Sequence, residues 1–139
     1  MSTTESTMSI LVYSDDRTTR EKVRLALGRR PAADVPKVSI HEVATAASAV
    51  KAVTAGGIDV LVLDGEATPT GGMGLARQLK EEIYQSPPVL ILLGRPQDAW
   101  LATWSRADAA VPHPLDALAV ATSVAELMRA RLRGLPAVS

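Results

Sequence analysis

The chain has 139 residues, enough for one domain of ordinary size, and its 15 Lys and Arg balance its 15 Asp and Glu. It has no Cys, which excludes a disulfide-stapled scaffold and a Cys-ligated metal site. Zero net charge argues against a chain built to grip nucleic acid or an anionic membrane, and no apolar run reaches the roughly 20 residues that span a bilayer. We therefore expect a cytoplasmic domain with no membrane insertion and no nucleic-acid partner.

Short apolar runs alternate with amphipathic stretches along the chain. Predicted strands cover 10–13, 37–43, 58–63, 88–93 and 109–111. Predicted helices cover 18–29, 44–55, 73–84, 97–106 and 115–132. Residues 1–7 are polar and carry no signal-peptide pattern. We expect 1–7 and 134–139 to be flexible tails on a single domain over 8–133, with no effector module beside it.

The predicted elements are a strand and a helix repeated five times. Such alternation indicates an α/β fold in which helices cover both faces of a parallel sheet, a three-layer sandwich. Strand 37–43 alternates polar and apolar residues, so it belongs at an edge. The flavodoxin-like, doubly wound (βα)5 order 2-1-3-4-5 places the first and third strands side by side, with a ligand site beyond their carboxyl ends.

Acidic residues follow these two neighbouring strands. Asp15 and Asp16 follow the first strand, and Asp64 follows the third. Because parallel neighbours end at the same edge of a sheet, three carboxylates should meet in one pocket, where a cation would relieve their repulsion. An all-oxygen set favours Mg²⁺. The alternative is that these are solvated loop acids, one of them capping the next helix.

These residues resemble those of the receiver domains of bacterial two-component response regulators, including stand-alone chemotaxis-type receivers. The resemblance covers about residues 8–133. It implies that Asp64 is the phosphoacceptor and that Asp15 and Asp16 hold Mg²⁺ with it. The implied chemistry is acyl-phosphate formation, with a phosphohistidine or a small phosphodonor as the source. A receiver is a signalling module, so we expect no enzyme in the ordinary sense.

Three positions depart from the family pattern. Leu93 replaces the Ser or Thr whose hydroxyl holds the phosphoryl group, and His113 replaces the Lys that precedes a Pro. Ala110 occupies the place of the switch aromatic, and the loop over 66–74 is longer and rearranged. Losing one charge-assisted contact costs about 1.5–3 kcal/mol. We therefore expect an atypical receiver in which phosphorylation and conformation are weakly coupled.

Two functions remain open on this pattern. One is an atypical single-domain receiver in a phosphorelay, acting by contact with a histidine kinase or another signalling or effector protein. The other is a phosphorylation-independent adaptor, a pseudo-receiver that binds its partner constitutively. An enzyme or flavin carrier on the same fold is least favoured, since the segment over 14–17 offers carboxylates where a phosphate-binding loop is needed.

Two further pairs of residues stand out. Trp100 and Trp104 lie four residues apart on the predicted helix 97–106, and either core packing or protein docking would explain them. In the family, the fourth helix, fifth strand and fifth helix form the partner surface, so the resemblance implies a partner or a homodimer through this face. Glu66 and Arg95 either form an ion pair across the pocket rim or are a solvated pair worth under about 1 kcal/mol, and the sequence leaves both interpretations open.

Overall fold

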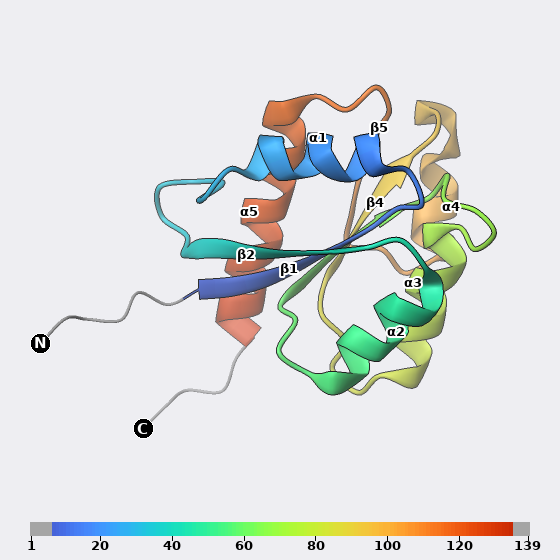
Figure 1. Cartoon of the computed structure of the whole chain (residues 1–139), viewed down its shortest axis with the longest axis horizontal. Coiled ribbons are helices and arrows are strands. Elements are labelled where there is room, and N and C mark those ends of the chain that lie inside the picture. The colour runs from blue at the N-terminus through green and yellow to red at the C-terminus, as the bar shows by residue number, and fades with distance from the viewer. Residues whose placement is uncertain (1–6, 135–139) are drawn as a thin grey trace, which may run out of the picture.

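The computed structural model describes residues 7–134 and shows one five-stranded sheet (Figure 1). All strand pairs are parallel, in the order β2-β1-β3-β4-β5. The strands are β1 (Thr7–Tyr13), β2 (Lys37–Val43), β3 (Val60–Asp64), β4 (Val89–Leu93) and β5 (Ala109–Pro112). The predicted flavodoxin-like fold and strand order are thus confirmed, with β2 at an edge as its alternating sequence indicates.

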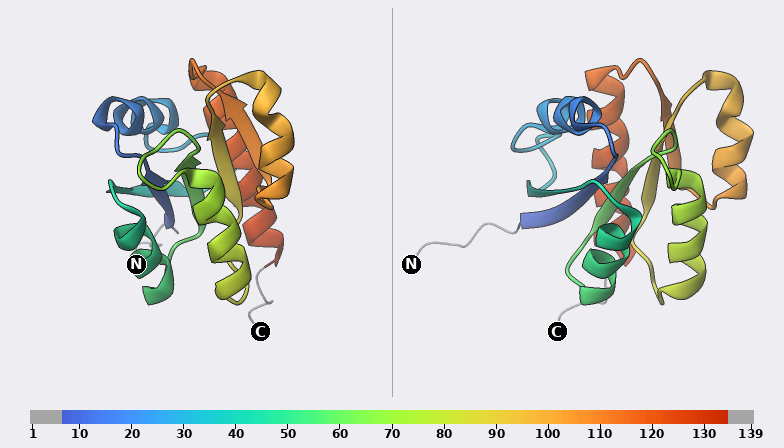
Figure 2. Two further views of the ribbon diagram at one scale, coloured as in Figure 1. Left: turned by 90° about the vertical axis from the view of Figure 1, so that its right-hand side faces the viewer. Right: turned by 45° about the vertical axis from the view of Figure 1, so that its right-hand side comes forward.

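The helices form a layer on each side of the sheet (Figure 2). They are α1 (Arg17–Leu27), α2 (Ala46–Ala55), α3 (Gly72–Glu82), α4 (Ala99–Trp104) and α5 (Ala117–Gly134). Helices α1 and α5 pack on one face, while α2, α3 and α4 pack on the other. Alternate residues of β1 enter the two cores, Ile10 and Val12 on the α1 side and Leu11 and Tyr13 on the other. Burial on both faces explains the unbroken apolar run.

Several helices begin or end at residues other than those predicted from the sequence, because helix-capping hydrogen bonds set their ends. Helix α1 ends at Leu27, two residues early, where Gly28 N–H donates to the Arg24 carbonyl. The predicted helix 97–106 begins as a 3₁₀ turn, η1 (Pro96–Asp98), so α4 has only six residues. The last helix starts at Ala117 rather than 115, since the Asp116 carboxylate accepts from Ala119 N at 3.0 Å.

The close approach of β3 and α3 fixes the position of Asp64. A Cβ on Gly72, the first residue of α3, would lie 2.7 Å from the Asp64 carbonyl oxygen. Only glycine allows that approach. The turn between them closes through a hydrogen bond from Ala67 N to the same carbonyl, at 3.1 Å. Asp64 is therefore held where the sheet ends.

The ends of the described chain bear on two predictions. Thr7 begins β1 and Gly134 ends α5, while the remainder of the predicted tails, 1–6 and 135–139, lies outside the described residues. Within residues 7–134, no helix combines the length and the apolar character needed to cross a membrane.

Candidate functional site

A cavity of about 330 Å³ opens at the carboxyl edge of the sheet. Its walls come from the ends of β1 and β3, the first turns of α1, and the segments after β4 and β5. The lining residues are Asp15, Asp16, Thr19, Lys22, Asp64, Glu66, Gly94 and His113. Asp15, Asp16 and Asp64 therefore share one cavity, as the strand order predicts.

Asp64 lies at the floor of the cavity and is only 3% exposed. Its Oδ2 accepts a hydrogen bond from the Ser14 hydroxyl at 2.7 Å, and its Oδ1 accepts from Glu66 N at 3.0 Å. Ser14 is fully buried at the end of β1. Hydrogen bonds to a carboxylate stabilise its charged form. The arrangement presents an oriented carboxylate to the cavity.

Asp15 and Asp16 are exposed and hydrogen-bonded to threonines. Asp15 Oδ2 accepts from the Thr68 hydroxyl at 2.9 Å. Asp16 caps α1, accepting from Thr18 N at 3.1 Å and from the Thr19 hydroxyl at 2.9 Å. These bonds, led by the one from Thr19, lower the pKa of Asp16 below its usual value. Both acids are thus solvated, and Asp16 serves as the cap that the alternative interpretation foresaw.

The carboxylates do not form a ready metal cage. In the part of the chain that the structure describes, no three His, Cys, Asp or Glu side chains are grouped closely enough to hold a metal ion. The donors at this edge are nevertheless all oxygens, the type that Mg²⁺ prefers.

The ends of β4 and β5 offer few polar groups to Asp64. Leu93 is 2% exposed and packs in the core on the α2–α3 side, and Gly94 is the β4-end residue that lines the cavity. His113 Nε2 lies 3.5 Å from Asp64 Oδ1, and this buried nitrogen has no hydrogen-bond partner. Ala110 is an exposed residue of β5. No hydroxyl therefore reaches Asp64 from β4.

Two other contacts replace an ion pair between Glu66 and Arg95. Arg95 donates to both carboxylate oxygens of Asp98, at 3.3 Å and 3.0 Å. The Glu66 carboxylate lies against Gly94, so closely that a Cβ there would overlap it. Because Asp98 is only three residues from Arg95, Arg95 pairs with this local carboxylate instead of with Glu66 across the rim. Glu66 instead adds a fourth carboxylate to the cavity.

The pKa of Tyr13 is affected by the negative charges at this edge of the sheet. Its side chain is buried, and its hydroxyl donates to the Thr70 carbonyl at 2.5 Å, which fastens the loop before α3 to β1. Burial raises the pKa of Tyr13 above its usual value, and the charges of Asp15 and Asp64 raise it further. Two of the predicted site carboxylates thus act on the same phenol.

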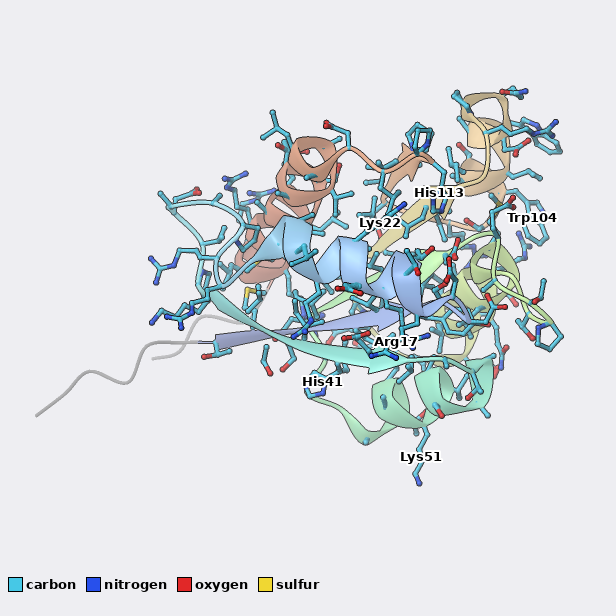
Figure 3. The ribbon with its side chains drawn as sticks, turned by 45° about the horizontal axis from the view of Figure 1, so that its top comes forward. Arg17, Lys22, His41, Lys51, Trp104 and His113 are labelled. Atoms are coloured by element: carbon cyan, nitrogen blue, oxygen red, sulfur yellow. The ribbon has the colours of Figure 1, made fainter. Side chains whose placement is uncertain are left out.

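Trp100 and Trp104 lie at the surface, so core packing does not explain them. Their exposed fractions are 67% and 50%. The Arg77 guanidinium of α3 lies 4.9 Å from the centre of the Trp104 ring and donates to the Trp104 carbonyl at 2.9 Å. Both residues belong to the short α4, and Figure 3 shows Trp104 at the side of the molecule away from β2.

Comparison with known proteins decides the family. No family model matches the sequence. Proteins from two strains of Mycobacterium tuberculosis, each named an uncharacterized response regulatory protein, are 52% identical over 130 residues, covering 94% of this chain and 98% of the relative. The chain belongs to the response regulator family. This response regulator is a receiver domain, so its function lies in two-component signalling.

Solved structures confirm the fold of this response regulator. The signal receiver domain of an HD domain-containing protein from Pseudomonas fluorescens Pf-5 superimposes with a TM-score of 0.77 at 14% identity, covering 96% of this chain and 95% of that one. The chemotaxis response regulator CheY4 of Vibrio cholerae gives 0.73 at 15% identity, covering 88% and 99%. The BeF3-activated DrrB receiver domain gives 0.71 at 20% identity, covering 89% and 99%. At these identities the likeness establishes the receiver fold.

Sequence reasoning missed Ser14 and Lys22 in this response regulator's site, and also Thr19 and Gly94, which line the cavity. Ser14 precedes Asp15 at the end of a buried strand, so its neighbour across the sheet is the end of β3, and the strand order alone would have placed it there. Lys22 follows Thr19 by three residues, the spacing of one helix face, and both line the cavity. The signal was the helical register after Asp16.

Proposed function

We propose that Asp64 accepts a phosphoryl group and that the domain passes the signal on by protein contact. The observation that carries the proposal is a buried carboxylate, held by Ser14 and by its own loop, at the floor of an open cavity. Such a carboxylate is oriented for attack on a donor that enters from solvent. A phosphohistidine of a histidine kinase is the expected source, and small phosphodonors are its stand-ins.

The reaction needs few groups from the protein. An oxygen of Asp64 attacks the phosphorus of phosphohistidine, a C–O–P bond forms and the P–N bond breaks. The imidazole leaves with the bonding electron pair and is protonated by solvent. The product is an acyl phosphate on Asp64, and its charge enters a cavity already lined by Asp15, Asp16 and Glu66. Neutralising this charge is therefore the main catalytic demand.

The oxygen donors of the cavity fit Mg²⁺, and we propose Asp15, Asp16 and Asp64 as the residues that hold it. The ion would neutralise charge on the transferring group. Asp64 is already fixed, whereas Asp15 and Asp16 are exposed and must exchange hydrogen bonds with threonines for metal contact. Because these hydrogen bonds must be broken for the metal to bind, we expect weak Mg²⁺ binding.

A second candidate function is the constitutive adaptor, which the β4–β5 side favours. Leu93 is packed in the core and Ala110 carries no ring, so a phosphoryl group on Asp64 has few contacts there through which to change β5. An adaptor would use the same surface whether or not Asp64 is modified.

We propose the exposed Trp100 and Trp104 as part of that surface. Trp is enriched among residues that dominate binding energy at interfaces. A homodimer through α4, β5 and α5 would bury both indoles. Sedimentation velocity of the wild type and of Trp100→Ala/Trp104→Ala distinguishes this arrangement, because a dimer of the wild type alone supports it and a monomer in both contradicts it. The cytoplasmic location expected from the sequence stays a prediction.

The test of phosphorylation is direct. The protein is incubated with Mg²⁺ and phosphoramidate or acetyl phosphate, and intact mass is recorded over time. We expect one added phosphoryl group in the wild type and in Asp98→Asn, a surface control, and none in Asp64→Asn. No adduct on the wild type contradicts the phosphoacceptor and leaves the adaptor as the explanation. An adduct that persists in Asp64→Asn places the reaction elsewhere.

A further inference from the structure

The cavity around Asp64 has an unequal charge balance. Four carboxylates line it, those of Asp15, Asp16, Asp64 and Glu66. Of the described residues that line it, Lys22 is the one Lys or Arg. An acyl phosphate on Asp64 carries about 1.5–2 negative charges, in place of the single charge of the free carboxylate. Any phosphoryl group bound here must find its counter-charge among very few groups.

Lys22 is placed to supply it. Asp16 is the N-cap of α1, and Thr19 and Lys22 follow it within the helix at three-residue steps; all three line the cavity. The positive charge of Lys22 already acts on Asp16, where it contributes to the lowered pKa of that carboxyl. Figure 3 shows Lys22 and His113 near one another at the same edge of the molecule, with Lys51 projecting from α2 on the opposite side.

Two other cations of α1, Arg20 and Arg24, are engaged in ion pairs, whereas Lys22 is available. Arg20 Nε lies 3.2 Å from Glu42 and Arg24 Nε lies 3.6 Å from the same carboxylate. Lys22 makes no side-chain hydrogen bond or ion pair within residues 7–134, and it is exposed. A four-carbon stem with a compact ammonium can follow a group that arrives from solvent.

His113 faces a different part of the site. Its Nε2 is buried beside Asp64 Oδ1, at 3.5 Å, and so addresses the carboxylate itself. The imidazole of His113 turns about only two side-chain bonds, whereas the Lys22 side chain turns about four, so the histidine has the shorter reach. Lys22, by contrast, stands on the helix that borders the opening. His113 therefore lies beside the Asp64 carboxylate, and Lys22 lies where an incoming phosphoryl group would enter.

We propose that the Lys22 ammonium binds the oxygens of the phosphoryl group on Asp64, supplying from α1 the counter-charge that the resemblance assigns to a Lys after β5. This inference rests on the proposed function of Asp64. Lys22 acts in the transfer step and in the product, because the negative charge it meets is present in both. The bond changes are those given above, and Lys22 exchanges no proton.

The test compares Lys22→Gln with Lys22→Arg and with Lys51→Gln, which removes the same charge from α2. Two measurements are made: the rate of phosphoryl uptake from phosphoramidate, and the affinity for beryllofluoride with Mg²⁺ by calorimetry. Losing a charge-assisted contact predicts that Lys22→Gln lowers both by about tenfold or more. Lys22→Arg should keep most of each, and Lys51→Gln should match the wild type.

A third measurement distinguishes loss of the Lys22 contact from damage to the fold of the variant. Titration with Mg²⁺ alone should show tighter binding to Lys22→Gln than to the wild type, since a nearby positive charge opposes a metal ion. A damaged fold would weaken both ligands together. Opposite changes for Mg²⁺ and beryllofluoride are therefore the expected signature.

The outcomes distinguish the two proposals. If the wild type is phosphorylated and Lys22→Gln equals it in both uptake and beryllofluoride affinity, the inference about Lys22 is wrong while Asp64 stands. If the wild type takes up no phosphoryl group, the proposed function fails. In that case Lys22-dependent binding of beryllofluoride still supports an anion contact by Lys22, and equal or absent binding overturns it.

Discussion

The two halves of the sheet's carboxyl edge place different groups beside Asp64. On the β1–α1 half, a buried hydroxyl from Ser14 holds the carboxylate, and Thr19 and Lys22 line the cavity above it. On the β4–β5 half, Leu93 turns into the core and the His113 Nε2 is buried without a hydrogen-bond partner. The side-chain hydrogen bond to Asp64 therefore comes from the β1–α1 half.

That difference bears on how a signal leaves the site. A modification shifts a conformational equilibrium only through contacts that differ between two states. A phosphoryl group on Asp64 meets a helix and a hydroxyl on one side and mostly apolar packing on the other. We infer that α1 and the loop after β3 respond to it more than β5 does, and the predictions below test this asymmetry.

The largest expected effect is at Leu93, where Thr restores the missing hydroxyl. Leu93 is 2% exposed within an apolar cluster, so Leu93→Thr removes packing and buries a hydroxyl, at a cost of about 2–4 kcal/mol in the free energy of unfolding. Urea denaturation measures it, with Leu93→Val as the milder control. The phosphorylated lifetime should not lengthen, and a clear lengthening would show that β4 does reach the phosphoryl group.

Ser14→Ala tests the polar half. Its hydroxyl bonds a buried carboxylate, and hydrogen bonds to charged groups contribute about 1.5–3 kcal/mol. Ser105 is the matched control, fully buried and donating to the neutral Ala102 carbonyl at 2.7 Å, where about 1 kcal/mol is expected. Urea denaturation of both variants at pH 7 gives the comparison. Equal losses in the free energy of unfolding for the two variants would mean that the hydrogen bond from Ser14 to Asp64 is no stronger than one to a neutral carbonyl.

Strand order and burial could be predicted because each depends on a repeated local pattern. The run over 60–63 is apolar on both faces, and Asp64 follows it, so its place beside Asp15 and Asp16 follows from topology. The Glu66 contact with Gly94 did not follow, since it depends on the path of a loop between residues 28 positions apart. The exposure of Trp100 likewise depends on how α4 packs, which the spacing leaves open.

A smaller effect is expected at the mouth of the cavity, between the two halves. Glu66→Gln removes one of four negative charges from an exposed position, so uptake of an anionic phosphodonor should rise by at most about fivefold. Gly94→Ala displaces the same carboxylate by overlap and should change the rate as well. The measurement is the rate of mass increase with phosphoramidate. A slower rate in Glu66→Gln would mean that the carboxylate assists transfer.

The smallest effect concerns how α1 and its following loop are held to α5. Arg129 donates to both oxygens of Asp34, each at 2.7 Å, and this contact lowers the pKa of Asp34 below its usual value. A lowered pKa means stabilisation above the ordinary carboxyl range, lost as pH falls through the folded value. The urea midpoints of wild type and Asp34→Asn should differ at pH 6 and converge toward pH 3. Arg129→Gln should give the same pattern, and a difference that persists at pH 3 contradicts the pairing.

The asymmetry of the edge is tested most directly by amide chemical shifts on adding Mg²⁺ and beryllofluoride to the labelled protein. The account predicts that the largest changes fall in residues 14–22 and 64–72, with small changes over 109–117. In Lys22→Gln the changes near residue 22 should shrink at the same ligand concentration. Changes over 109–117 as large as those over 14–22 would contradict the claim that the phosphoryl group is held from the β1–α1 half.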